Sequence, residues 1–319
     1  MACHADFAPP GMWINDNWFA RDGDTYHVFY LQVPRCIGDE NCWKLRGGLQ
    51  WIGHATSTDL VNWTDQGPVI VPIRGTWIES LATGSVAPAE GKWWMVFTVG
   101  AGKPGVGLAV SDDLMTWRVV GDGPVVPTAE YTGVWQGQPL RWWPCANPYL
   151  YPEPIDGWWV IVINAQVTGA EPGSNGCLAT LRSRDLRTWE PGPVLLYPQT
   201  IERLETPQLW RHGAYWYLYF GAAHDQEQIS SCWQAEVPVE IRDRRRVNCL
   251  YMADRWDGPY RPIPGRWWLD ELPGGGGGYI HKVLPGPEGT HVLLTTTGQL
   301  RLSRPYEVVY GEDGGVTLR

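Results

Sequence analysis

The stretch "ATSTDLVNW", residues 55–63, has the pattern Ser-x-Asp-Leu-x-x-Trp, which returns along the chain. Close copies are "AVSDDLMTW" at residues 109–117 and "TLRSRDLRTW" at residues 180–189, and weaker copies begin at Tyr251 and Leu300. The aspartate of such a motif can accept hydrogen bonds from the amides of a turn, and its tryptophan can close an apolar layer. A turn motif that occurs five times predicts a chain built from five similar units.

A strand-like run precedes each copy of this turn motif. The runs are rich in aromatic and β-branched residues and open on glycine or a polar pair, which is typical of a strand that leaves a hairpin. They are "GDTYHVFYLQ" from Gly23, "GKWWMVFTVG" from Gly91, "DGWWVIVINA" from Asp156, "HGAYWYLYFG" from His212 and "EGTHVLLTTT" from Glu288. Long runs with helical spacing of apolar residues are nearly absent, so the chain is expected to be all-β.

The repeat length indicates how these units assemble. Units of about 55 to 75 residues, each a short all-β sheet, are typical of radial repetition. A four-stranded sheet cannot cover both of its faces alone, whereas five sheets around an axis cover one another. The sequence therefore predicts a five-bladed β-propeller that forms a single domain over residues 1–319. The expected blades cover roughly residues 10–75, 76–135, 136–200, 201–265 and 266–319.

Composition and charge exclude several classes of function. The 319-residue chain has a net charge of −9 with its acidic residues spread out, which argues against binding to nucleic acid or to an anionic membrane. No run of about 18 apolar residues is present, so no membrane span is expected. One basic run, residues 242–246, is interpreted as a solvated loop. The expected partner is a small carbohydrate or similar glycoside.

The start of the chain and its cysteines bear on location and cofactors. The first residues show neither a basic segment nor an apolar segment of a secretory signal, so a cytoplasmic location is expected. The seven cysteines are then expected to be buried thiols. Cys36 and Cys42 are close enough to form a small disulfide loop or to supply two metal ligands, but standard zinc spacing is missing. No metal and no cofactor are expected.

Candidate site residues lie in the segments just before the five strand-like runs. In a propeller these segments hold the innermost strands, whose side chains converge on a central channel. Asp16 and Glu205 are expected to occupy the same register of their repeats, and this pairing favours chemistry over the alternative roles of turn cap and solvent-facing residue. The polar residues of these segments are Asn15 and Asp16 in the first repeat, Glu79, Thr83 and Ser85 in the second, Asn147 in the third, Glu205 in the fourth, and His281 and Lys282 in the fifth.

These segments resemble the invertase and fructan hydrolase family, glycoside hydrolase family 32, and more distantly family 43. "WINDNW" is similar to the W-M-N-D-P-N-G box, whose aspartate is the nucleophile, which implies that role for Asp16. "LETPQLW" is similar to the E-C-P-x-L-F box, which implies that Glu205 is the acid/base. "CANPYLY" aligns with the R-D-P box. It places Asn147 at the aspartate that stabilises the transition state, and Ala146 at the arginine.

The same resemblance implies sugar-binding positions. "VFYLQ" is similar to the F-Y-Q strand, which implies a sugar contact for Gln32. "LQWIGHATSTDLVNW" looks like W-G-H-A-x-S-x-D-L-x-x-W and contains Trp51, while "ATGSV" resembles the F-S-G-S segment and places Ser85 near the sugar. The remaining candidate substrate-binding residues, all expected on innermost strands, are Trp13, Asn15 and His281.

The implied reaction is retaining cleavage of a small fructoside or arabinoside. Asp16 would attack the anomeric carbon while Glu205 protonates the leaving oxygen, with the two carboxyl groups about 5 Å apart. Two alternatives stay open. The propeller could serve a biosynthetic transfer or cyclisation, because a fold does not fix a chemistry, or it could bind carbohydrate without catalysis. The family's C-terminal β-sandwich is not expected, because the chain ends soon after the fifth repeat.

Overall fold

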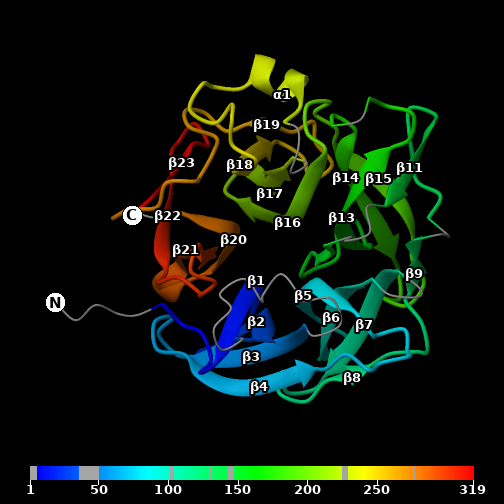
Figure 1. Ribbon diagram of the computed structural model, residues 1–319, viewed down its shortest axis with the longest axis vertical. Helices are drawn as coiled ribbons and strands as arrows, with labels where there is room; N and C mark the ends of the chain where they lie inside the picture. The colour runs from blue at the N-terminus through cyan, green and yellow to red at the C-terminus, as the bar shows by residue number, and fades with distance from the viewer. Residues whose placement is uncertain are drawn as a thin grey trace.

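Five antiparallel sheets surround a central axis, which confirms the predicted five-bladed β-propeller (Figure 1). The structure is a computed structural model. It describes residues 6–35, 50–100, 104–128, 131–142, 147–171, 173–224, 229–275 and 277–319. Cys36, Cys42 and Ala146 lie outside the described residues. Within the described parts of the chain, no helix is long and apolar enough to cross a membrane.

Each sheet is one blade, and in the first, fourth and fifth blades the strands follow the order of the chain from the axis outward. The first blade contains β1 (Met12–Asp22), β2 (Thr25–Pro34), β3 (Trp51–Ser57) and β4 (Thr64–Ile70). The second contains β5 (Leu81–Ala89), β6 (Lys92–Val99), β7 (Gly105–Ser111), β8 (Arg118–Val119) and β9 (Val126–Pro127). The third contains β10 (Val134–Trp135), β11 (Gln138–Trp142), β12 (Tyr149–Leu150), β13 (Trp159–Val167), β14 (Gly176–Ser183) and β15 (Glu190–Leu196).

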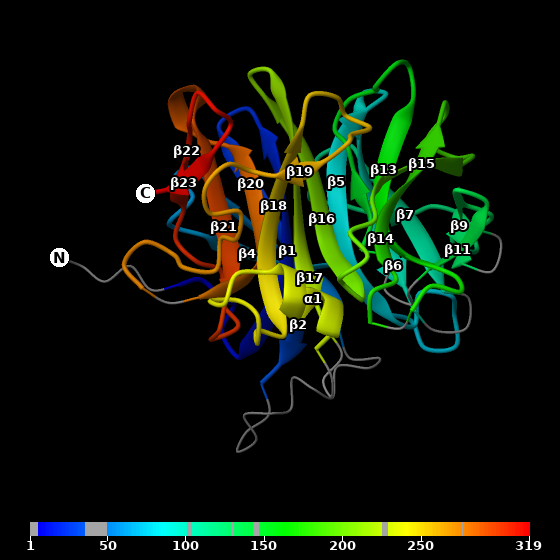
Figure 2. The same cartoon turned by 90° about the horizontal axis from the view of Figure 1, so that it is seen from above.

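The last two blades have four strands each. The fourth contains β16 (Arg203–His212), β17 (Tyr215–Ala223), β18 (Arg246–Ala253) and β19 (Arg261–Pro262), with the short helix α1 (Ser231–Glu236) between β17 and β18. The fifth contains β20 (Gly278–Pro285), β21 (His291–Thr297), β22 (Tyr306–Tyr310) and β23 (Val316–Leu318). A 3-10 turn, η3 (Pro287–Gly289), joins β20 to β21. The inner strands β1, β5, β16 and β20 stand around the axis in both views (Figures 1 and 2).

The recurring turn motif has the structure that its sequence predicts. The Asp59 carboxylate accepts hydrogen bonds from the amides of Val61 and Asn62, at 2.9 and 2.7 Å. The Trp63 indole donates to the carbonyl of Leu60 at 3.2 Å, and Leu60 adopts a left-handed conformation with a φ of 63°. The equivalent residues are Asp113, Leu114 and Trp117 in the second blade, and Asp185, Leu186 and Trp189 in the third.

Apolar clusters fill the spaces between neighbouring blades and close the ring. Each pair of neighbours shares its own cluster, so every sheet is covered on both faces. Between the last and first blades, Ile14 packs in one cluster with Leu284 and Leu294. The amides and carbonyls of Phe7 and Leu302 exchange two hydrogen bonds, at 2.9 and 2.8 Å, so the start of the chain is joined to the fifth blade.

Four of the innermost strands contain a β-bulge near their start. The extra residue is Asp16 in β1, Thr83 in β5, Thr206 in β16 and Ile280 in β20. Asn147, just before β12, has a φ of 44°, close to the 40° of Asp16. A bulge re-aims the side chain of the extra residue, and bulges are common beside active sites. These five residues form one ring around the channel, hereafter the bulge ring.

Candidate active site

Asp16 is held against the channel wall by the neighbouring blade. It is 8% exposed, and the Thr83 hydroxyl donates a hydrogen bond to its carboxylate. A left-handed backbone is unfavourable for most residues other than glycine, and persists only where the surrounding structure requires it. The contact therefore links two members of the bulge ring and fixes the direction of the Asp16 carboxylate.

Glu205 lies on β16 and has two donors of its own. The Tyr279 hydroxyl donates to the Glu205 carboxylate at 2.7 Å, and the Arg203 guanidinium lies 3.5 Å from its other oxygen. The Glu205 side chain is 17% exposed, so it remains open to a ligand. Burial and the adjacent Glu205 charge raise the pKa of Tyr279, which keeps this hydroxyl protonated as a donor.

The expectation that Asp16 and Glu205 share a register is wrong by one residue. Asp16 is the bulged residue of β1, whereas the bulge of β16 falls after Glu205, at Thr206. Glu205 instead corresponds to Asn15, since both pair regularly with the next strand just before the bulge. The two carboxylates thus leave their strands from different backbone geometries.

Asn147 occupies the place of the third blade in the bulge ring. It is 5% exposed, and its backbone amide donates to the Thr98 hydroxyl at 3.0 Å. Its side-chain amide makes no hydrogen bond to the parts of the chain that the structure describes. The Asn147 side chain can therefore both donate to and accept from a bound hydroxyl group, but it brings no charge.

Lys282 places a buried amine between the first and fourth blades. It is 4% exposed, and its Nζ donates to the carbonyls of Thr206 and Pro207 at 2.7 and 3.3 Å. Burial lowers the pKa of Lys282 to about 7, while the Asp16 carboxylate acts in the opposite direction. The amine thus electrostatically favours the ionised form of Asp16, the form that a nucleophile needs.

His281 does not line the channel, although it was expected to bind substrate. It is 1% exposed, and its Nε2 lies 2.8 Å from the carbonyl of Leu269. Neighbouring residues on a strand point to opposite faces. Because the bulge at Ile280 gives the channel side to Lys282, His281 points away from it.

The other expected sugar-binding residues are spread over four strands. Trp13 and Asn15 of β1 and Gln32 of β2 line one cavity of only about 10 Å³. Trp51 of β3 pairs with Gln32, two strands out from the axis. The Ser85 hydroxyl accepts a hydrogen bond from the Leu150 amide at 2.7 Å. Of these residues, Asn15 lies beside Asp16, whereas Ser85 joins two blades farther along the channel.

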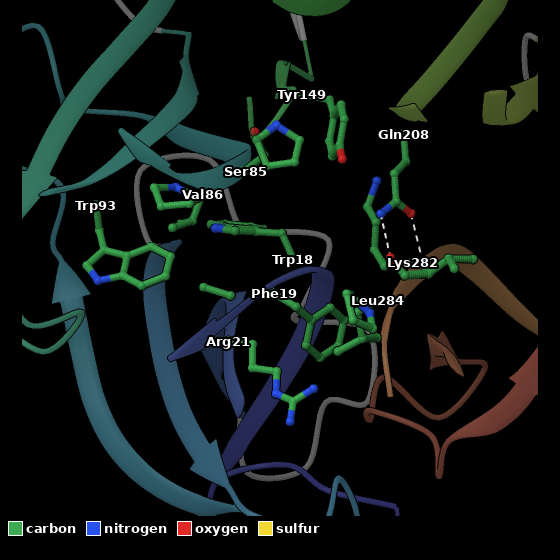
Figure 3. A pocket seen from close by; sticks show the side chains of 15 residues that line it. Trp18, Phe19, Arg21, Ser85, Val86, Trp93, Tyr149, Gln208, Lys282 and Leu284 are labelled. Atoms are coloured by element: carbon green, nitrogen blue, oxygen red, sulfur yellow. Dashed lines mark hydrogen bonds between the residues drawn. The ribbon is translucent and has the colours of Figure 1, made fainter. Parts of the chain in front are cut away.

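A second cavity continues along the channel beyond the bulge ring (Figure 3). It has a volume of about 290 Å³. Ser85, Gln208 and Lys282 line it, each two residues past a bulge, and Gln208 is held by the amide and carbonyl of Val283 at 2.8 and 2.6 Å. The rest of the lining is mainly aromatic and aliphatic, including Trp18.

Replacement of Lys282 by methionine is expected to flatten the pH dependence of stability. Below pH 7 the buried Lys282 amine is protonated in the native protein, so the full free-energy cost of burying this ammonium lowers the stability of the fold. As pH rises from about 7 towards the ordinary value of 10.5, the unfolded chain binds more protons at this position than the native chain, and stability rises. The free energy of urea unfolding should increase by roughly 2 kcal/mol from pH 7 to pH 9 because of Lys282 alone, and Lys282→Met should lose this increase. Lys92→Met, at an exposed position, is the control, and an equal increase in Lys282→Met would contradict the assignment.

The family model and the curated relatives point to one family. The description "Glycosyl hydrolases family 32 N-terminal domain" matches residues 6–209. A sucrose-6-phosphate hydrolase of Escherichia coli is 27% identical over 224 residues, covering 68% of this chain and 43% of that protein. An insoluble β-fructofuranosidase of Arabidopsis thaliana is 27% identical over 199 residues, covering 57% of this chain and 29% of that protein. The chain thus spans less than half the length of either relative.

Solved structures share the fold at lower identity. A β-fructofuranosidase of Bombyx mori superposes with a TM-score of 0.72 and 17% identity, covering 99% of this chain and 64% of that one. An inulosucrase of Halalkalicoccus jeotgali bound to kestose has a TM-score of 0.68 and 17% identity, covering 98% and 90%. An α-L-arabinofuranosidase of Clostridium thermocellum superposes with a TM-score of 0.61 and 14% identity, covering 95% of this chain and 92% of that one. These similarities support the propeller fold.

Proposed function

The chain belongs to glycosyl hydrolases family 32, and we propose from this premise that it cleaves a small fructoside with retention of configuration. The observation that carries the proposal is the pair of positioned carboxylates. Asp16 is fixed at a bulge by a hydrogen bond from Thr83. Glu205 lies on β16, where it accepts a hydrogen bond from Tyr279, and a carbonyl of the same strand accepts one from Lys282. The names of the relatives in Escherichia coli and Arabidopsis thaliana support a fructoside over an arabinoside.

The proposed reaction has two steps. Asp16 attacks the anomeric carbon and forms a glycosyl ester, while Glu205 gives its proton to the leaving oxygen as the glycosidic bond breaks. Glu205, now a carboxylate, takes a proton from a water molecule that attacks the same carbon and releases Asp16. Thr83 orients the nucleophile, and the amine of Lys282 favours its ionised form.

Anomeric analysis of the product tests the proposal. The purified protein would be incubated with a panel of fructosides and arabinosides, and the configuration of the released sugar followed by NMR before it mutarotates. Retention on a fructoside is expected, and inversion would contradict the double-displacement mechanism. Tight binding of a sugar without turnover would instead favour the carbohydrate-binding alternative.

Asn147 is proposed to bind hydroxyl groups of the sugar in the transition state. Truncation to alanine should lower kcat/KM by about tenfold, because a hydroxyl group then loses its partner in a desolvated site. Asn147→Asp should restore or exceed the wild-type value, because hydrogen bonds to a charged acceptor are stronger. Initial rates on the best fructoside measure both effects, with Asn62→Ala in an exposed turn as control.

If Asn147→Asp lowers kcat/KM as much as Asn147→Ala, the uncharged amide is itself required. That result would favour the transfer or cyclisation alternative, in which the site is adapted to something other than hydrolysis of a simple fructoside.

A further inference from the structure

The cavity of about 290 Å³ beyond the bulge ring has an inner end at the ring and an outer end in solvent (Figure 3). Each blade contributes one residue to the inner end, two positions after its member of the ring. These residues are Trp18, Ser85, Tyr149, Gln208 and Lys282. The outer end is formed by exposed residues five positions after the ring. They are Arg21, Pro88, Pro152 and Pro285. The cavity therefore opens on the side of the bulge ring away from Glu205.

The wall between these two ends is largely apolar. Trp18 and Phe19 of the first blade and Leu284 of the fifth line it. Sites for small molecules are mostly apolar, with a few placed polar groups, and begin at a volume of about 300 Å³. Aromatic side chains contact other rings in offset or edge-on arrangements. The cavity is thus suited to a compound with a single aromatic ring.

The inner end of the cavity is held in shape by contacts between blades. Gln208 donates to the carbonyl of Val283 and accepts from its amide, at 2.6 and 2.8 Å. The Ser85 hydroxyl accepts from the Leu150 amide at 2.7 Å. These groups already have protein partners, so the geometry around the Lys282 amine does not depend on a ligand.

The Lys282 amine can lose its charge without losing either of its hydrogen bonds to the fourth blade. Its Nζ donates to the carbonyls of Thr206 and Pro207 at 2.7 and 3.3 Å. A neutral primary amine still has two protons for these two carbonyls, and its lone pair is left over. Burial lowers the pKa of Lys282 to about 7, so about half of the amines are neutral at pH 7. An ordinary lysine is neutral in roughly one molecule in a thousand at this pH.

The titratable groups around this amine come from four strands. They are Asp16 and Arg21 on β1, Tyr149 on β12, Glu205 on β16 and Tyr219 on β17. Burial raises the pKa of both tyrosines, so they stay uncharged at neutral pH. The Asp16 carboxylate opposes the effect of burial on Lys282, and burial is the larger of the two. Arg21 lies at the exposed outer end, where solvent screens its charge.

We propose that Lys282 is a nucleophilic amine that captures a small aromatic aldehyde in this cavity as an imine. A lysine desolvated in an apolar pocket is a nucleophile for carbonyl compounds. The nitrogen lone pair attacks the aldehyde carbon, and a proton passes from nitrogen to the carbonyl oxygen, which gives a carbinolamine. The hydroxyl group then leaves as water with the second amine proton, while nitrogen forms a double bond to carbon. Amine and aldehyde thus yield imine and water, with no oxidant or reductant.

The surroundings of Lys282 fit this product. The protonated imine keeps one N–H, which can still donate to the carbonyl of Thr206. Its aromatic ring would lie against the apolar wall, beside Trp18. Because the cavity opens away from Glu205, the aldehyde reaches the amine without passing the acid/base.

Reductive trapping tests this reaction. The full chain would be incubated at pH 7 with benzaldehyde and cyanoborohydride, which reduces an imine to a stable benzylamine, and peptide mass spectrometry would give the rate at each lysine. The exposed Lys92 is the control within the same sample. Lys282 should be modified at least about tenfold faster than Lys92. Equal or slower modification of Lys282 in the folded protein overturns the inference.

Two changes of condition show whether the fold creates this reactivity. In urea, where the cavity is lost, the advantage of Lys282 over Lys92 should disappear. At pH 10 the advantage should shrink, because the neutral fraction of Lys282 rises only about twofold from pH 7, whereas that of an ordinary amine rises by several hundredfold or more. An advantage that is unchanged in urea would contradict the assignment to the cavity.

Benzyl alcohol tests whether the cavity holds the aromatic ring. It has the ring of benzaldehyde without the carbonyl group, so it should slow modification of Lys282 and leave that of Lys92 unchanged. Among variants, Lys92→Met should keep the fast adduct and Lys282→Met should lose it. Modification of Lys282 that benzyl alcohol does not slow overturns the proposed site. None of these measurements needs turnover of a fructoside, so their outcome is independent of the proposed function.

Discussion

Asp16→Asn is expected to lower kcat by on the order of 10⁴-fold on any fructoside that the wild type cleaves, with little change in stability. The amide has nearly the shape of the carboxylate and can still accept from Thr83, so the bulge of β1 should persist. It cannot form the glycosyl ester, because it lacks the nucleophilic oxygen anion. Single-turnover kinetics, with thermal unfolding of the same samples, measure both halves of this expectation.

The control for this prediction is Asp22→Asn, at the exposed end of the same strand. It removes the same charge from β1 without approaching the channel and should retain wild-type turnover. Turnover in Asp16→Asn within tenfold of the wild type would eliminate Asp16 as the nucleophile.

Thr83→Val adds a graded test. It removes the donor to Asp16 while keeping the shape of the side chain, and kcat should fall by less than in Asp16→Asn.

The second large effect is expected for Glu205→Ala. Loss of a general acid and base lowers turnover by about 10² to 10⁴-fold. The loss should be greatest for poor leaving groups, since these depend most on protonation. Azide, which needs no base to attack, should partly restore turnover and yield a fructosyl azide with the configuration of the substrate.

Rescue by azide distinguishes this role from a structural one. Glu202→Ala is the matched control, because Glu202 lies outside the strand, and neither loss nor azide product is expected for it. An azide adduct of inverted configuration would show that no covalent intermediate forms on Asp16. If Glu205→Ala loses most of its turnover and azide restores none of it on any substrate, Glu205 positions other groups rather than transferring a proton.

The fold could be predicted from the sequence because the turn motif that indicates it is local and repeated. The turn motif around Asp59 satisfies its own backbone, and the copies at Asp113 and Asp185 repeat the same hydrogen bonds. Such signals need no knowledge of neighbouring blades. The bulge residue Asp16 could also be singled out as a candidate, because its box carries the resemblance to the family within six residues.

The site was harder to predict from the sequence, because one extra residue in a strand changes which side chains face the channel. A bulge at Ile280 decides between His281 and Lys282, and the period-2 pattern does not reveal where the bulge occurs. The same uncertainty shifted the register of Glu205 relative to Asp16.

Contacts between blades were beyond any local pattern. Thr83 was recognised as a polar residue of an inner strand, but its bond to Asp16 spans two blades. Tyr279 reaches Glu205 from another blade, 74 positions along the chain. Only the closed ring brings such residues together.

The hydrogen bonds that Phe7 and Leu302 exchange close the seam between the first and fifth blades, and the stability of this seam bears on the proposed reaction. The first blade supplies Asp16, and the fifth supplies Lys282 and Tyr279, so the seam between these blades divides the catalytic apparatus itself. Opening of this seam would disperse the reacting groups while every individual sheet stayed intact. Under the proposed function, activity therefore requires the closed ring of blades, and its loss would report that the first and fifth blades have separated.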